Sequence, residues 1–304
     1  MTWKIFFSFI FILITMSSLI FYWFIPLNKF EFYQGYSSDN FNFTLNDSSK
    51  EMQFYENMRY SDPKISYRIL DCTLQKRYNI ERAFEMISNT TSLSFYEVEF
   101  NEEIFATCDS RNKIEGELFI AGEGGPVNIT KTENFNVILK GEILLIKESK
   151  CEKPNIALHE LFHSLGFDHS PNPSSIMYNT SKCNQNIGQD IVDKINELYS
   201  SPSYPDLTFE NVSAIMHGKY LDTNITIRNH GLKDSEKTKL IISSGEKIIK
   251  ETEIDSLKIG YGITMSLNNI LVSKINIQEL KFLIDSNFSE LKKNNNEIKL
   301  EIKK

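Results

Sequence analysis

The sequence predicts an α+β domain followed by an all-β, immunoglobulin-like sandwich, with one transmembrane helix at the N-terminus. Three patterns support this prediction: an uncharged apolar run at the start, mixed strand and helix periodicities in the middle, and only short alternating runs at the end. The predicted segments are a transmembrane signal-anchor at 5–25, a juxtamembrane spacer at 26–61, the α+β domain at 62–201 and the sandwich at 202–304.

The first predicted element is the apolar helix from Ile5 to Ile25, a run of 21 residues without a charge. A helix of this length can span a hydrocarbon layer of about 30 Å. A cleaved signal peptide is the alternative, but its apolar core usually has about 7–15 residues and ends in small residues. No alanine precedes Ala83, so the composition favours a retained single-pass anchor over a secreted protein.

The cysteines and the net charge indicate the compartment and exclude one class of partner. The four cysteines, Cys72, Cys108, Cys151 and Cys183, suit two disulfides in an oxidising compartment. Three pairings are possible, and we favour the local one, Cys72 with Cys108 and Cys151 with Cys183. We therefore expect the bulk of the chain to be extracellular. A formal net charge of −7 offers no basic face for phosphates, so no nucleic-acid partner is expected.

The elements of the α+β domain follow from periodicity and turn residues. Strands are predicted at 64–70 and 93–100, with two or three more in 116–122 and 136–146 around a glycine-rich loop at 122–128. Three helices are predicted. The first runs from an N-cap at Asn79 to Ile87, the second begins at Pro154 and ends at Gly166, and the third runs from an N-cap at Asn186 to Tyr199.

The second of these helices carries the motif HELFHSLGFDH, residues 159–169. His159 and His163 are four residues apart and share a helix face, and Gly166 lets the chain turn so that His169 can join them. Three histidine nitrogens with one open position are the ligand set of a catalytic zinc, beside which Glu160 would serve as general base. The alternative is an amphipathic helix with solvent-facing histidines.

The motif and its surroundings resemble the metzincin clan and, within it, the matrixins. The third histidine leads into HSPNPSSIMY (169–178), which is similar to the segment that ends in the Met-turn of matrixins. ISYRI and NIERAFEMISNTTSLSFYEV upstream, and IGQDIVDKINELY downstream, are also similar to matrixin sequences, so the resemblance covers about residues 62–201.

The resemblance implies a zincin-like fold, with a five-stranded sheet, the active-site helix beneath it and a protein or peptide substrate along the edge strand. It also implies that the three histidines bind one catalytic Zn²⁺ and that Glu160 is the base. Met177 would form the hydrophobic floor under the zinc, and Tyr178 would shape the cleft or stabilise the oxyanion. Two departures limit the resemblance. Residues 90–158 contain no histidine, so a structural zinc is not expected and calcium has little support, and Asn179 replaces the usual proline.

The C-terminal block resembles CARDB-type (cell-adhesion-related) sandwich domains in PDLTFENV, ITIRNHG and FLIDSNFSELKKNNNEIKLEI. Such domains imply binding or spacing, and a surface ligand of this block is the partner that the binding role would require. The sequence as a whole predicts a membrane-anchored, extracellular zinc endopeptidase. The alternative is a zinc-binding adhesion or binding protein that has the same fold and no catalysis.

Overall fold

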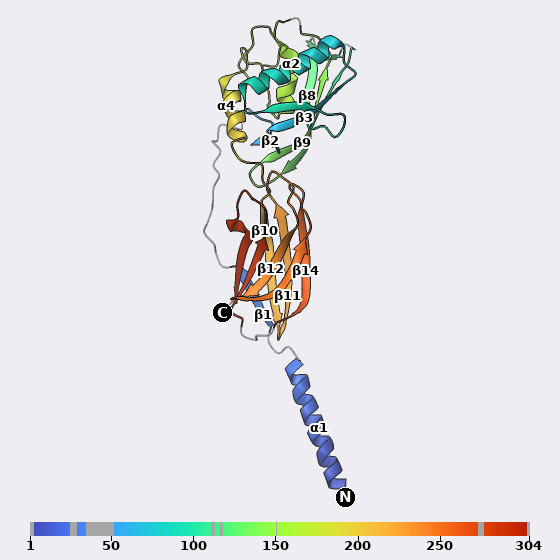
Figure 1. The fold of residues 1–304 in the computed structure, drawn as a ribbon, viewed down its shortest axis with the longest axis vertical. Coiled ribbons are helices and arrows are strands. Elements are labelled where there is room, and N and C mark those ends of the chain that lie inside the picture. Colours follow the sequence, from blue (N-terminus) through green and yellow to red (C-terminus); the bar gives the residue numbers. More distant parts are fainter. Residues whose placement is uncertain are drawn as a thin grey trace. The chain divides into compact units, whose positions relative to one another are not determined.

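The computed structural model describes residues 3–24, 29–34, 52–110, 113–115, 118–149, 151–272 and 277–302. The chain divides into two compact units, drawn in Figure 1. The first unit comprises residues 40–205 and 230–234, and the second comprises residues 1–39, 206–229 and 235–304. Each unit has its own hydrophobic core.

Helix α1 (Trp3–Phe24) is the first element of the chain and coincides with the predicted apolar helix. Its side chains Phe6, Phe9 and Phe11 are each more than half exposed. No helix in the described part of the chain combines the length and the apolar character required to cross a membrane.

The first unit is built on a mixed six-stranded sheet. Its strands are β2 (Met58–Tyr60), β3 (Lys64–Leu70), β4 (Ser94–Glu97), β5 (Ile104–Cys108), β8 (Gly122–Lys131) and β9 (Asn136–Leu145). The order β2-β9-β5-β3-β4 is parallel throughout, and β8 pairs antiparallel with β9. A separate hairpin is formed by β6 (Lys113–Glu115) and β7 (Leu118–Ile120). The sheet has one strand more than the five that the resemblance implied, because the short β2 joins it.

Three helices pack in this unit: α2 (Leu74–Thr90), α3 (Asn155–Ser164) and α4 (Gln189–Leu198). Two of the predicted caps are wrong. Thr73 caps α2 by accepting a hydrogen bond from the Lys76 N–H, and Asn79 lies buried inside the helix. The first turn of α2 escaped prediction because its polar and exposed residues give no apolar period. Likewise α4 follows Gly188, while Asn186 forms a bridge with Ser175.

The glycine-rich stretch 122–128 is also different from its prediction, since it forms most of strand β8 and not a loop. A Cβ atom at Gly124 would overlap the carbonyl oxygen of Glu160, and one at Gly122 would lie 2.6 Å from the Glu160 Cγ. Glycine in a strand often marks such a close approach of another backbone. These glycines therefore let β8 lie directly against α3.

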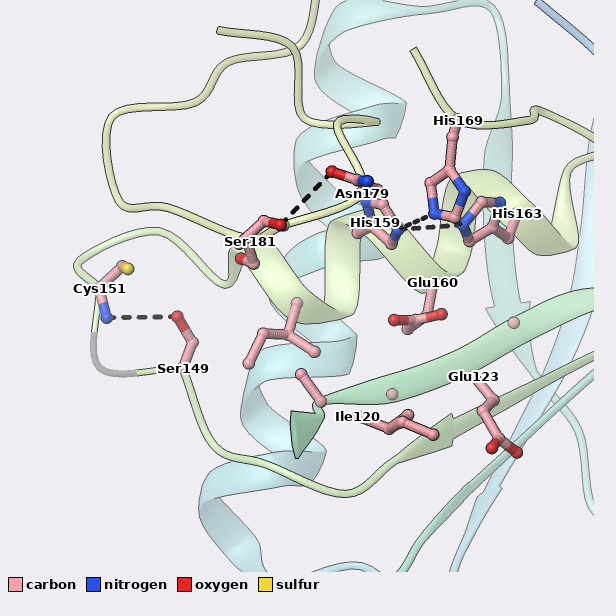
Figure 2. A pocket seen from close by; sticks show the side chains of 15 residues that line it. Ile120, Glu123, Ser149, Cys151, His159, Glu160, His163, His169, Asn179 and Ser181 are labelled. Carbon is pink, nitrogen blue, oxygen red and sulfur yellow. Dashed lines mark hydrogen bonds between the residues drawn. The ribbon is translucent and has the colours of Figure 1, made fainter. Parts of the chain in front are cut away.

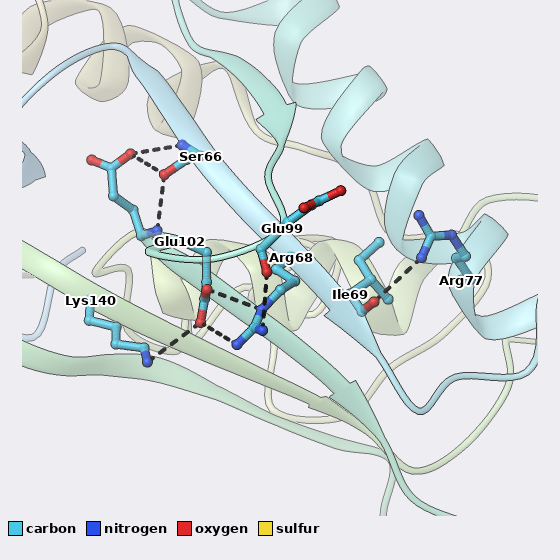
Figure 3. A network of polar contacts seen from close by, with 8 residues as sticks. Ser66, Arg68, Ile69, Arg77, Glu99, Glu102 and Lys140 are labelled. Atoms are coloured by element: carbon cyan, nitrogen blue, oxygen red, sulfur yellow. Dashed lines mark hydrogen bonds and ion pairs between the residues drawn. The ribbon is translucent and has the colours of Figure 1, made fainter.

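A network of charged side chains links strands β3, β5 and β9 (Figure 3). Glu102 precedes β5 and accepts from Arg68 at 3.1 Å, and the Lys140 Nζ lies 3.7 Å from the same carboxylate. The guanidinium of Arg68 and the ammonium of Lys140 also lie over the ring of Phe105. Because Glu102 is nearly buried, this pairing compensates for the cost of removing its charge from water.

Both disulfides of the structure lie in the first unit, and they match the favoured local pairing. Cys72 is bonded to Cys108, which joins the turn before α2 to the end of β5. Cys151 is bonded to Cys183, which joins the segment before α3 to the segment before α4. Each bond closes a loop of more than thirty residues, and closing such a loop restricts the unfolded chain.

The second unit is an all-antiparallel set of eight strands in the order β13-β12-β15-β16-β1-β10-β11-β14. Its strands are β1 (Lys29–Gln34), β10 (Leu207–His217), β11 (Tyr220–Asn229), β12 (Thr238–Ser244), β13 (Lys247–Ile254), β14 (Gly262–Leu271), β15 (Glu279–Asp285) and β16 (Glu297–Ile302). The Glu290 carboxylate accepts from the Leu207 N–H, and Asn295 donates to Asp206. The two ends of the CARDB-like block are thus joined to each other.

The predicted spacer at 26–61 is wrong for residues 29–34, which form β1 between β10 and β16. The alternating stretch KFEFYQ could have predicted this strand, but it follows the apolar run so closely that it resembled a tether. Residues 52–60 belong to the first unit, where Arg59 is fully buried and donates to the carbonyls of Leu198 and Ser201. The first unit is therefore inserted in the chain between two neighbouring strands of the second.

Replacing Phe32 tests whether β1 stabilises the second unit. Phe32 is 4% exposed in the core of that unit, and truncating such a residue to alanine costs about 3–5 kcal/mol. We expect Phe32→Ala to lower the free energy of unfolding of the second unit by that amount, measured by denaturant titration. Lys250→Ala, on an exposed position of β13, should change it by less than about 0.5 kcal/mol. Equal denaturation midpoints for the two variants would show that Phe32 of β1 contributes nothing to the stability of the second unit.

Candidate active site

Helix α3 carries two of the three motif histidines and Glu160. The helix is buried along its length, with Leu158, Leu161 and Phe162 in the core. It ends in a Schellman turn, in which the Gly166 N–H donates to the His163 carbonyl and the Phe167 N–H donates to the Phe162 carbonyl. Gly166 has φ +94°, a left-handed conformation that glycine adopts without strain. This turn directs the chain back toward the helix.

The turn brings His169 to His159 and His163, so the three imidazoles face one another (Figure 2). The Nε2 atoms are 3.0 Å apart for His159 and His163, 3.2 Å for His163 and His169, and 3.3 Å for His159 and His169. On the opposite ring edge, the Nδ1–H of His159 donates to the Ile176 carbonyl and that of His163 to the Phe167 carbonyl, both at 2.7 Å. These bonds leave the Nε2 lone pairs of His159 and His163 directed at the shared point.

This donor set fits a zinc ion. Tetrahedral Zn–N bonds of about 2.0–2.1 Å place the ligand nitrogens about 3.3 Å apart, close to the separations of the three Nε2 atoms. Burial, chiefly, lowers the pKa of His159, and burial together with the neighbouring His159 lowers the pKa of His163 to about 4. Neutral imidazoles are the form that binds a metal. The Nε2 atoms of His159 and His163 lie 3.0 Å apart, and a cation between them would relieve the mutual repulsion of their lone pairs.

Glu160 follows the first of these histidines in sequence and is 5% exposed. Its side chain points toward the strand that carries Glu123 (Figure 2). Burial raises the pKa of the Glu160 carboxyl to about 8, and the charge of Glu123 adds to the shift. A carboxylate in this position can take up a proton near neutral pH.

The site opens into a cleft of about 730 Å³. One side is formed by β8 residues, and the other includes Asn179, Thr180 and Ser181, which follow the Met-turn. Gln185 is buried behind this wall, where its side chain accepts from the Lys182 N–H and donates to the Thr180 carbonyl. Cys151 lines the cleft as well, and its disulfide to Cys183 ties this part of the lining to the segment that follows the 179–181 wall.

The Met-turn residues take two different positions. Met177 is 1% exposed in the core, and its carbonyl accepts from the Ser170 N–H at 2.8 Å, one residue after His169. Tyr178 is only partly buried and is not among the described residues that line the cleft, although it was expected to shape it.

The sequence did not single out Gln185, Gly122 or Gly124. Only the glycine cluster had offered a signal, and it had been assigned to a loop.

Comparison with known proteins agrees with this geometry. Residues 59–200 match the family model described as Matrixin, and residues 204–300 match the model described as CARDB. Rat macrophage metalloelastase is 28% identical over 174 residues, which are 49% of this chain and 36% of the relative. Rat stromelysin-2 is 27% identical over 175 residues, 50% of this chain and 35% of the relative. The chain thus spans about a third of the length of these curated relatives.

The fold and the histidine site define the class: the first unit contains a domain similar to matrixins, with a three-histidine group that fits a zinc ion. More particularly, residues 59–200 form a matrixin-like domain, and residues 204–300 form a CARDB-like domain.

Gly124 provides a test of the close packing between β8 and α3. Gly124→Ala forces a methyl group into the main chain of Glu160, and overpacking of this kind costs about 1–3 kcal/mol. We expect a lower unfolding midpoint and a lower zinc content, measured by denaturant titration and metal analysis. The neighbouring Gly125 has open space at its Cβ, so Gly125→Ala should match the wild type. Two variants of equal stability and zinc content would contradict the packing argument.

Proposed function

We propose that this protein is a zinc endopeptidase that hydrolyses protein or peptide substrates at the cleft between β8 and the 179–181 wall. The observation that carries the proposal is the convergence of three Nε2 atoms beside the Glu160 carboxyl, at the floor of an open cleft. His159, His163 and His169 would hold one Zn²⁺. Glu160 would be the catalytic base, and the buried Met177 would support the metal site from below.

The chemistry divides between the metal and the chain. A zinc ion at the histidines supplies Lewis-acid chemistry, which polarises a carbonyl and makes a water molecule more acidic. Glu160 takes the proton of the attacking water on its carboxylate and later gives it to the leaving amine. The buried position of Glu160 in the lining of the cleft, next in sequence to His159, supports this double role.

Strand β8 supports an extended peptide as substrate. It pairs with β9 along one edge, and no strand among the described residues occupies its other edge. An extended chain can add to such an edge through main-chain hydrogen bonds, with side-chain pockets giving specificity. The relatives are named metalloelastase and stromelysin, names that support a protein substrate without identifying it for this chain.

Glu160→Gln is the direct test of the proposed chemistry, because glutamine keeps the size of the side chain and cannot accept the proton. We expect kcat for an unfolded protein such as casein to fall by about 10²- to 10⁴-fold, with zinc stoichiometry unchanged. Treatment with a chelator should abolish cleavage, and added Zn²⁺ should restore it. A full-length chain that binds one zinc and cleaves nothing would favour the alternative, a zinc-binding adhesion protein.

We further propose that the protein is held in the membrane by residues 5–25, with the matrixin-like domain and the CARDB domain outside the cell. The uncharged apolar run supports anchoring, and two disulfides support an oxidising compartment. In this arrangement the CARDB domain binds a surface ligand or spaces the protease domain from the membrane.

Membrane fractionation tests the anchor. We expect the full-length chain to remain with membranes after an alkaline carbonate wash, and a variant lacking residues 5–25 to appear in the soluble fraction. If cells expressing the full-length chain released into the medium a product that begins after residue 25, the result would instead support secretion after signal cleavage.

A further inference from the structure

Residues Met52–Phe54 form a short strap beside the turn that connects the second and third histidines. The Phe54 N–H donates to the Gly166 carbonyl, and the Asp168 N–H donates to the Met52 carbonyl, each at 3.0 Å. The two bonds make an antiparallel bridge between Gln53 and Phe167. The strap therefore fixes the main chain of the turn between His163 and His169.

The turn needs this support because it sets the position of two histidines at once. The Phe167 carbonyl accepts from the Nδ1–H of His163, and it therefore determines the rotation of that imidazole. Asp168 is bonded to the strap through its main chain and directly precedes His169, which is exposed. A shift of the turn would change the separations among the Nε2 atoms.

The strap also touches a histidine directly. The ring of Phe54 stacks on the His163 ring, with centroids 5.7 Å apart and planes inclined by 25°. His163 is thus held at its Nδ1 edge by a carbonyl and on one face by an aromatic ring. Together these contacts restrict the ring to one orientation.

The strap is itself anchored to the sheet. The Gln53 side chain is 4% exposed, and it donates to the Met58 carbonyl at 2.8 Å and accepts from the Met58 N–H at 3.1 Å. Met58 is fully buried in β2 and packs against Gly166, where an added Cβ would lie 2.8 Å from the Met58 Cβ. The strap and the turn are therefore held to the same strand.

From these contacts we propose that Gln53 and Phe54 are positioning residues of the metal site, which preorganise His163 and His169 for zinc. The inference rests on the proposed zinc site and adds a segment N-terminal to the first strand of the sheet. Groups that orient metal ligands commonly change metal affinity by about 10–100-fold when they are lost. The strap would therefore act on zinc affinity.

Phe54 allows this role to be separated from stability. Its side chain is 38% exposed, so truncating it should leave the fold of the metal-free protein nearly unchanged. Its neighbour Tyr55 is 60% exposed in the same segment and provides a matched aromatic control. Phe54→Tyr keeps the ring, and it should keep the stacking on His163.

The experiment measures zinc dissociation constants of the full-length chain by competition with a chromophoric chelator, together with unfolding midpoints of the metal-free forms. We expect Phe54→Ala to raise the dissociation constant about tenfold or more. Tyr55→Ala and Phe54→Tyr should stay within about twofold of the wild type, and the metal-free midpoints should be alike.

Each outcome has a separate meaning. If Phe54→Ala binds zinc as tightly as the wild type, the positioning role is wrong and the zinc site stands. If its affinity falls only together with the metal-free midpoint, or if Phe54→Tyr does not restore the affinity, Phe54 is merely structural and the inference fails. If the wild type itself binds no zinc, the proposed function fails as well.

Discussion

The left-handed conformation of Gly166 is the constraint on which the site depends. Without it α3 would continue, and His169 would be carried away from the other two histidines along the helix axis. With it, the helix ends within three residues of His163, and the chain returns at close range. Met58 and the strap hold the outer side of the same turn, so the sheet, the helix and the histidine site are all in contact with Gly166 or its neighbours.

A second constraint is the removal of water from the Glu160 carboxyl. Glu160 lies beneath a strand in which two glycines allow the backbones of β8 and α3 to touch. Burying a carboxyl without a cation raises the free energy of its charged form, which is why its pKa is high. A dication at the neighbouring histidines would offset this cost. The buried Glu160 carboxyl and the three histidine nitrogens would thus all be stabilised by a cation bound at the histidines.

Features with a local signal in the sequence were predictable, and features made by distant contacts were not. The spacing of His159, His163 and His169 and the position of Gly166 predicted their convergence, because helix geometry alone relates them. Phe54 offered no such signal, since it and His163 lie far apart in the sequence and meet only in the folded unit. The glycines of β8 were assigned to a loop because the reason for them is a tertiary contact. They allow α3 to approach the strand closely, and the local sequence gives no sign of that contact. Asn79 resembled a cap, but tertiary burial extended α2 past it.

The insertion of the first unit between β1 and β10 has a consequence for how the protein is made. Phe32 pairs with Ala214, so the ribosome must synthesise almost the entire protease domain between two strands that will become hydrogen-bonded neighbours. Contacts so distant in sequence carry an entropy cost of loop closure, and folds rich in them tend to form slowly. The matrixin-like domain can fold before β1 pairs with β10 and β16. That pairing then completes the second unit. A single proteolytic cut in either connection would leave the other intact, so release of the matrixin-like domain from the second unit would require two cuts.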